Sequence, residues 1–156
     1  MLQIDITGFD SKDNLQFKVN GNPSNDGNGK AHKGEDVQWK VQPGSGIGAI
    51  ADIKMKTGSG APPSINIFSS GPAPQGGGTQ SQHWKGTVSL GVPDYAEYCY
   101  DIFWVKENTG ETKKFDPKIS IYPQRSIVMA IIIALVSILT GLFFFFRIKK
   151  KFNKLA

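Results

Sequence analysis

The sequence has few of the side chains that bind metals or carry out catalysis. Its 156 residues include one cysteine, Cys99, and two histidines, His32 and His83. A lone cysteine excludes an intramolecular disulfide and leaves the redox state of the compartment open. Two histidines in turn-like sequence give no serine triad with a recognisable spacing. We therefore expect no enzyme activity, no metal site and no cofactor.

Acidic residues are missing from the end of the chain. The formal net charge is +5. Residues 1–125 carry 13 basic and 13 acidic side chains, whereas residues 147–156 carry basic residues only. The excess charge thus lies in a short tail, which does not predict nucleic-acid binding. The tail residues that we expect to contact anionic lipid headgroups are Arg147, Lys149, Lys150, Lys151 and Lys154.

The segment before this tail has no charged residue at all. Residues 126–146 read SIVMAIIIALVSILTGLFFFF, which is 21 uncharged residues. As a helix this segment would be about 31 Å long, and the hydrocarbon core of a bilayer is roughly 30 Å thick. We predict a folded domain over residues 1–124, a transmembrane helix over 125–147 and a basic tail over 148–156.

Small residues recur within the apolar segment. Ala130, Ala134, Ser137 and Gly141 follow one another at spacings that place them on one face of a helix. Small side chains allow a second transmembrane helix to approach closely, so we predict a helix-docking face. The alternative is that these residues are simply common in membrane helices.

The side of the membrane on which the domain lies is less strongly indicated. The start, MLQIDITGFDSKD, lacks the basic and apolar regions of a signal peptide. If Met1 is the native start, the chain is a tail-anchored protein with a cytosolic domain. The basic tail favours the opposite orientation, although residues 113–125 also carry basic residues. We expect a single-pass protein, for example of a bacterial inner membrane, with a cytosolic domain; the periplasmic or exoplasmic side remains the alternative.

Residues 1–124 show period-2 alternation and no convincing amphipathic helix. The alternating runs are residues 2–6, 15–19, 37–41, 53–56, 65–67, 84–90, 95–106 and 119–121. Separated by turn residues, they predict an all-β, antiparallel two-sheet sandwich of cupredoxin-like or immunoglobulin-like type. The run 95–106 is apolar on both faces, which indicates a central strand or one exposed for a partner. Trp39, Trp84 and Trp104 occupy alternating positions, which favours the core over a sugar-stacking platform.

Long Gly/Pro-rich stretches separate these runs, and we expect them to be loops that either bind a partner or stay flexible. They are residues 20–30, 43–48, 57–64 and 69–82.

Two segments resemble the cupredoxin family of β-sandwiches. KGEDVQWKV, residues 33–41, resembles a family strand with a Gly-Asp-x-Val-x-Trp pattern, and GVPDYAEYCY, residues 91–100, resembles the strand that leads to the copper-binding cysteine. DPKISI, residues 116–121, would then be the last strand. A blue-copper site also needs two imidazoles, usually with an axial methionine, and neither residue follows Cys99 where the family places it. The resemblance implies the fold and not a copper site.

These observations predict a non-catalytic accessory subunit of an integral-membrane complex of respiratory, photosynthetic or transport type. The helix would dock against the complex and the sandwich would cover part of it. Two alternatives stay open: a cupredoxin-derived electron carrier, and a membrane-tethered receptor for a ligand or glycan.

Overall fold

The computed structural model describes residues 1–57 and 62–123. Residues Met1–Pro123 form one compact unit. The predicted transmembrane helix and basic tail lie outside the described residues. Within those residues, no helix is long and apolar enough to span a membrane.

The described part of the chain consists of β-strands joined by turns and loops, which confirms the all-β prediction. Eleven strands are present: β1 (Leu2–Phe9), β2 (Leu15–Val19), β3 (Asn22–Ser24), β4 (Gly29–His32), β5 (Asp36–Val41), β6 (Ile47–Met55), β7 (Phe68–Pro74), β8 (His83–Val88), β9 (Glu97–Lys106), β10 (Thr112–Phe115) and β11 (Lys118–Tyr122).

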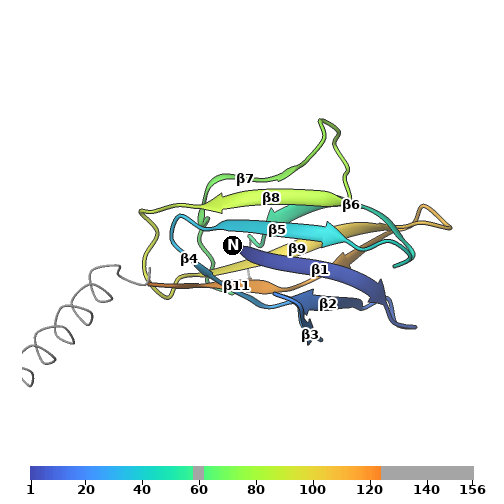
Figure 1. Cartoon of the computed structure of the whole chain (residues 1–156), viewed down its shortest axis with the longest axis horizontal. Coiled ribbons are helices and arrows are strands. Elements are labelled where there is room, and N and C mark those ends of the chain that lie inside the picture. Colours follow the sequence, from blue (N-terminus) through green and yellow to red (C-terminus); the bar gives the residue numbers. More distant parts are fainter. Residues whose placement is uncertain (58–61, 124–156) are drawn as a thin grey trace, which may run out of the picture. The chain divides into compact units, whose positions relative to one another are not determined.

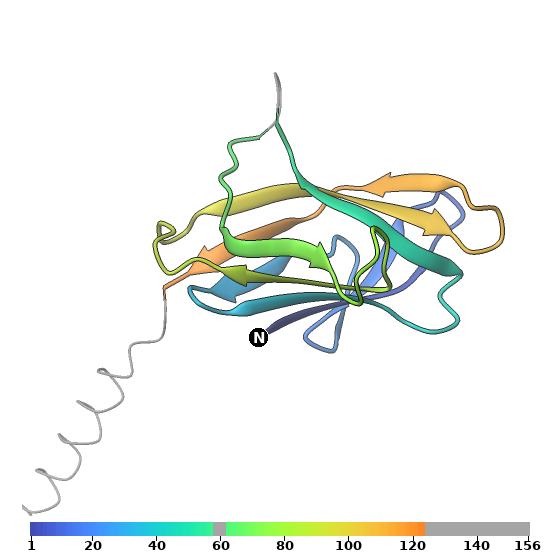
Figure 2. The ribbon, with the colours of Figure 1, turned by 90° about the horizontal axis from the view of Figure 1, so that it is seen from above.

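The strands form two sheets that face each other (Figure 1). The six-stranded sheet has the order β3-β2-β1-β5-β8-β7, and the five-stranded sheet has the order β10-β9-β11-β4, with β6 also paired to β9. Strand β6 and strand β10 take opposite sides of β9, since both pair with residues 102–105. Figure 2 shows the two layers from above.

Both sheets are mixed, so the prediction of a purely antiparallel sandwich was wrong. β1 pairs in parallel with β5, and β11 pairs in parallel with β4. The chain forms β1, β2 and β3 in one sheet, contributes β4 to the other, and then returns with β5 beside β1. Alternation along a strand reports which residues are buried but carries no information on the direction of a neighbour that is distant in sequence.

The core lies between the sheets and follows the predicted alternation. Leu2, Ile4 and Ile6 of β1 are fully buried, as are Ile102 and Trp104 of β9. Strand β9 has partners on both sides, so of the two alternatives for this strand the central position is the observed one.

All three tryptophans are interior, as expected. Trp39 and Trp104 are fully buried, and Trp84 is nearly so. The indole Nε1 of Trp84 donates a hydrogen bond to the Ile50 carbonyl at 3.2 Å. These rings are therefore unavailable to stack on a sugar.

Several segments differ from the sequence-based expectation. Strand β3 lies within a stretch expected to be a loop, β4 and β7 overlap such stretches, and β6 begins at Ile47 inside the Gly-rich 43–48 stretch. Residues 65–67, expected to be a strand, precede β7 without joining a ladder. Strand β7 is exposed along its middle and contains Pro72 and Pro74, features typical of a sheet edge.

Candidate functional site

The predicted helix-docking residues and the predicted headgroup-binding residues lie outside the described residues. The structure does describe the place where the chain leaves the sandwich toward them. We call this place the exit end, and define it as residues 33–35, 89–96 and 122–123. In Figure 1 it lies at the left, where β8 connects to β9 and β11 ends.

The chain is held firmly up to Pro123. The Nδ1 of His32 donates a hydrogen bond to the Pro123 carbonyl at 2.8 Å. Two residues before Pro123, Ile121 makes two more hydrogen bonds. Its carbonyl accepts from the Tyr95 amide and its amide donates to the Ala96 carbonyl, both at 2.8 Å. The β8–β9 connection thus clamps the end of β11, so the last described residue belongs to the folded domain.

Two large apolar side chains project from the exit end. Leu90 and Tyr95 are each 70% exposed, in contrast to the fully buried core residues. Leu90 lies over Gly34, where a Cβ would approach its Cδ2 to 2.9 Å. The Tyr95 ring contacts the Tyr122 ring edge-on, with centroids 6.0 Å apart. Both side chains are thus supported from beneath and open to solvent above.

Two lysine side chains lie near these apolar residues. The Nζ of Lys30 lies 5.2 Å from the centroid of the Tyr122 ring, within cation–π range. The Nζ of Lys33 pairs with Asp94 at 2.6 Å. The exit end therefore combines exposed apolar surface with lysine side chains.

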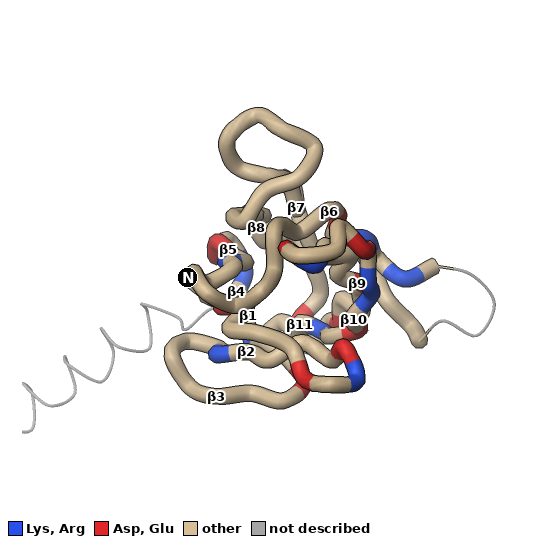
Figure 3. Tube along the Cα trace, turned by 90° about the vertical axis from the view of Figure 1, so that its right-hand side faces the viewer, with Lys and Arg blue, Asp and Glu red and all other residues tan. Residues whose placement is uncertain are grey.

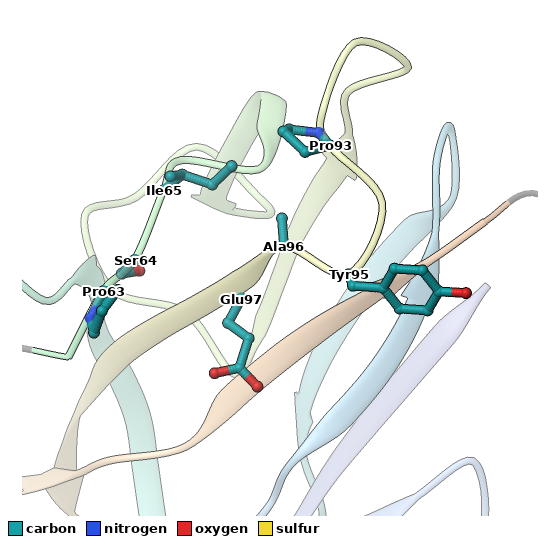
Figure 4. Close-up of a pocket in the computed structure, with 7 residues that line it drawn as sticks. All are labelled: Pro63, Ser64, Ile65, Pro93, Tyr95, Ala96 and Glu97. Carbon is teal, nitrogen blue, oxygen red and sulfur yellow. The ribbon is translucent and has the colours of Figure 1, made fainter.

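A shallow groove of about 370 Å³ adjoins the exit end (Figure 4). Its lining is mostly apolar: Pro63, Ser64, Ile65, Pro93, Tyr95, Ala96 and Glu97. The Ser64 Oγ fixes one wall, because it accepts a hydrogen bond from the Cys99 amide at 2.9 Å. In Figure 4 the Tyr95 ring points away from the other lining residues rather than into the groove.

A second, more polar pocket of about 410 Å³ lies beside Cys99. Lys118 donates to Glu97 at 2.8 Å, and this hydrogen bond lowers the pKa of the Glu97 carboxyl. Lys56 pairs with Asp116, which raises the pKa of Lys56.

Cys99 itself is 6% exposed, and burial raises the pKa of its thiol. A neutral thiol is a weak nucleophile and a poor metal ligand. The side chain thus acts as a small buried apolar group.

The two histidines and the cysteine, the softer ligands that a metal site could use, lie apart. His32 lies at the end of β4, His83 begins β8 in the other sheet, and Cys99 is in β9. Across residues 1–57 and 62–123, no three His, Cys, Asp or Glu side chains gather in a way that could hold a metal ion.

Asp101, a charged residue in the middle of β9, is paired with lysines. Its carboxylate lies 3.8 Å from Lys56 Nζ and 3.5 Å from Lys114 Nζ.

The opposite end of the sandwich, which we call the far end, is rich in charge. Here Asp13 pairs with Lys106 at 2.6 Å and with Lys113 at 3.0 Å, and Lys113 also pairs with Glu111 at 2.6 Å. Figure 3 views the molecule from this side and shows acidic and basic residues next to each other along β9 and β10. The two ends thus differ in chemistry.

Sequence reasoning did not find the exit end. Its one local signal is the stretch SLGVPDYA, residues 89–96, where Leu90 and Tyr95 stand among turn residues that rarely surround core positions. Comparison with known proteins adds no assignment, because no protein-family model and no curated protein sequence matches the chain.

Proposed function

We propose that this protein is a non-catalytic accessory subunit of an integral-membrane complex of respiratory, photosynthetic or transport type. Residues 125–147 form its single transmembrane helix. The helix docks against the complex through Ala130, Ala134, Ser137 and Gly141, and the sandwich covers part of the complex.

The observation that carries this proposal is the short distance along the chain between the folded domain and the apolar segment. The hydrogen bonds to Pro123 and Ile121 hold the chain in the domain up to Pro123. Only Gln124 and Arg125 then precede residue 126. Three Cα–Cα steps span at most about 11 Å, so the domain stays close to the membrane. This suits a fixed subunit better than a carrier that must travel on a long tether.

The basic tail supports the same arrangement. Arg147, Lys149, Lys150, Lys151 and Lys154 follow the apolar segment directly. Each basic residue near an anionic bilayer surface contributes about 1 kcal/mol of attraction. The tail therefore anchors the C-terminal end of the helix on lipid headgroups.

We also infer that the sandwich is cupredoxin-like. The two segments that resemble the family, residues 33–41 and 91–100, contribute to facing sheets. They meet in the core through the Trp39–Tyr100 hydrogen bond of 3.0 Å. This long-range contact supports the resemblance in order and spacing and adds no copper chemistry to it.

The test is native gel analysis of the full chain, extracted with a mild detergent from the cells that make it. The wild-type chain should migrate in an assembly much larger than its own 17.0 kDa. The variant Ala134→Leu/Gly141→Leu should weaken the association constant about tenfold, equivalent to about 1.4 kcal/mol, and so lower the assembled fraction, because bulky side chains separate the helices.

The matched control is Leu139→Phe, which adds volume on the opposite helix face and should leave assembly unchanged. Migration of the wild-type chain as a monomer would overturn the subunit proposal. Copper or another transition metal in the purified chain would favour the electron carrier instead, and binding of a glycan or small molecule would favour the receptor.

A further inference from the structure

We propose that the exit end rests on the lipid headgroup layer of the bilayer, with Leu90 and Tyr95 entering the interface. This inference depends on the membrane anchor of the proposed function and adds a second, non-covalent contact between domain and membrane.

The first observation is where the exposed apolar side chains lie. Among the described residues, the large hydrophobic side chains classed as exposed are Met1, Ile65, Leu90 and Tyr95. The two most exposed, Leu90 and Tyr95, belong to the exit end, and Ile65 lines the groove beside it. Apolar side chains left in water at one end indicate a surface that is covered in the functional state.

The second observation is the backbone of Tyr95. Its φ is +62°, in the left-handed region that bulky residues rarely adopt. This conformation costs about 1–2 kcal/mol for a residue with a Cβ. It places the ring outside the groove, as Figure 4 shows. A tyrosine held outward at such a cost is consistent with a functional position, and tyrosine is a residue that membrane interfaces favour.

The third observation is the charge at the two ends. At the exit end, Lys30 lies against the Tyr122 ring, where its ammonium group can reach lipid phosphates, while Lys33 is paired with Asp94 and Glu35 with the N-terminal amine. The Asp13–Lys106–Lys113–Glu111 network occupies the far end, where contact with lipid would remove water from four charged groups. Both ends carry ion pairs, so the exposed Leu90 and Tyr95, together with Lys30, make contact through the exit end the favourable orientation.

The short stretch of chain between the domain and the apolar segment indicates that lipid is what covers the exit end. Residue 126, the first of the apolar segment, is three residues after Pro123. The membrane-spanning segment thus begins within about 11 Å of the exit end, whatever path the linker takes. Because the link between Pro123 and residue 126 is so short, a bilayer that holds the apolar segment must lie next to the exit end.

Photocrosslinking of the full chain in phosphatidylcholine/phosphatidylglycerol vesicles tests the proposal. A benzophenone amino acid is placed at position 90, at position 95 or, as the matched control, at position 109 in the β9–β10 turn. Positions 90 and 95 should crosslink to lipid at least about fivefold more than position 109, because β9 separates the two ends by roughly 33 Å. All three positions are on the surface, so the core is left intact.

Vesicle flotation after an alkaline wash separates the two proposals. Loss of the wild-type chain from the vesicles would refute the anchor on which both depend. Retention in the vesicles with equal lipid crosslinking at positions 90, 95 and 109 would overturn the present inference alone. In native membranes, crosslinks from positions 90 and 95 to another protein instead of lipid would also overturn it.

Discussion

The indole Nε1 of Trp39 donates a hydrogen bond to the hydroxyl of Tyr100 at 3.0 Å, across the interface between the two sheets. Both side chains are fully buried, and their rings meet edge-on with centroids 5.8 Å apart. Trp39 comes from β5 and Tyr100 from β9. The bond therefore satisfies two polar groups in the core and fixes how the sheets face each other.

Removal of the hydroxyl of Tyr100 should destabilise the sandwich. Tyr100→Phe leaves the Trp39 N–H buried without an acceptor, which costs about 1–3 kcal/mol. The measurement is urea unfolding of the full chain in detergent, followed by tryptophan fluorescence. Tyr95→Phe, at an exposed position, should change the unfolding free energy by less than about 0.5 kcal/mol. A loss for Tyr100→Phe no larger than that of this control would contradict the role of the bond.

Tyr98 should make the domain less stable in alkali. Burial, with a smaller contribution from the Asp52 charge, raises the pKa of Tyr98 to about 12, from 10.0. Between these values the folded state retains a proton that the unfolded state has lost, so the contribution of Tyr98 is complete below pH 10 and is lost as pH rises toward 12. Its slope reaches at most about 1.4 kcal/mol per pH unit. Tyr98→Phe should make the unfolding free energy fall less steeply with pH in alkali. The same slope in the variant and the wild type would contradict the role of Tyr98.

Cys99 should react slowly with thiol reagents in the folded protein. The side chain is buried, and burial raises the pKa of its thiol, so little thiolate is present at neutral pH. Modification by Ellman's reagent should be at least about a hundredfold slower in native buffer than in urea, because reaction waits for local opening. A cysteine introduced by Leu90→Cys should react at similar rates in both conditions. Rapid native modification of the wild-type chain would show that Cys99 is accessible.

Gly29 should tolerate no side chain. A Cβ there would lie 2.6 Å from the Cδ2 of Leu2, which is fully buried in the facing sheet. Gly29→Ala should cost about 1–3 kcal/mol through overpacking of the core. Gly91→Ala is the matched control, since its nearest contact would be the Ser89 Oγ at 3.8 Å. Equal unfolding free energies for the two variants would mean that Leu2 can move aside.

Much of the sheet structure was predictable from local pattern. The alternation of Leu2, Ile4 and Ile6 predicted β1, and the run 95–106 predicted a strand that is either central or exposed for a partner, because burial on one or both faces of a strand leaves a period-2 or continuous apolar signature. Strand β4 leaves no such signature. Its one fully buried side chain is Ala31, and the strand exists because Gly29–His32 pair with β11, 90 residues later in the chain. Pairing between distant segments is decided by the assembled fold.

For the candidate site too, some features follow from the sequence and others only from the tertiary structure. By itself the sequence determined an uncharged segment over residues 126–146, a basic tail and a neutral domain, since length, apolarity and charge are properties of consecutive residues. Only the tertiary structure decided that Leu90, Tyr95, Tyr122 and Pro123 share one end of the sandwich. Leu90 and Tyr95 come from the β8–β9 connection, whereas Tyr122 and Pro123 lie at the end of β11, and the hydrogen bonds between this connection and β11 bring them together. Their exposure depends on what packs around them in three dimensions, and no local pattern records it.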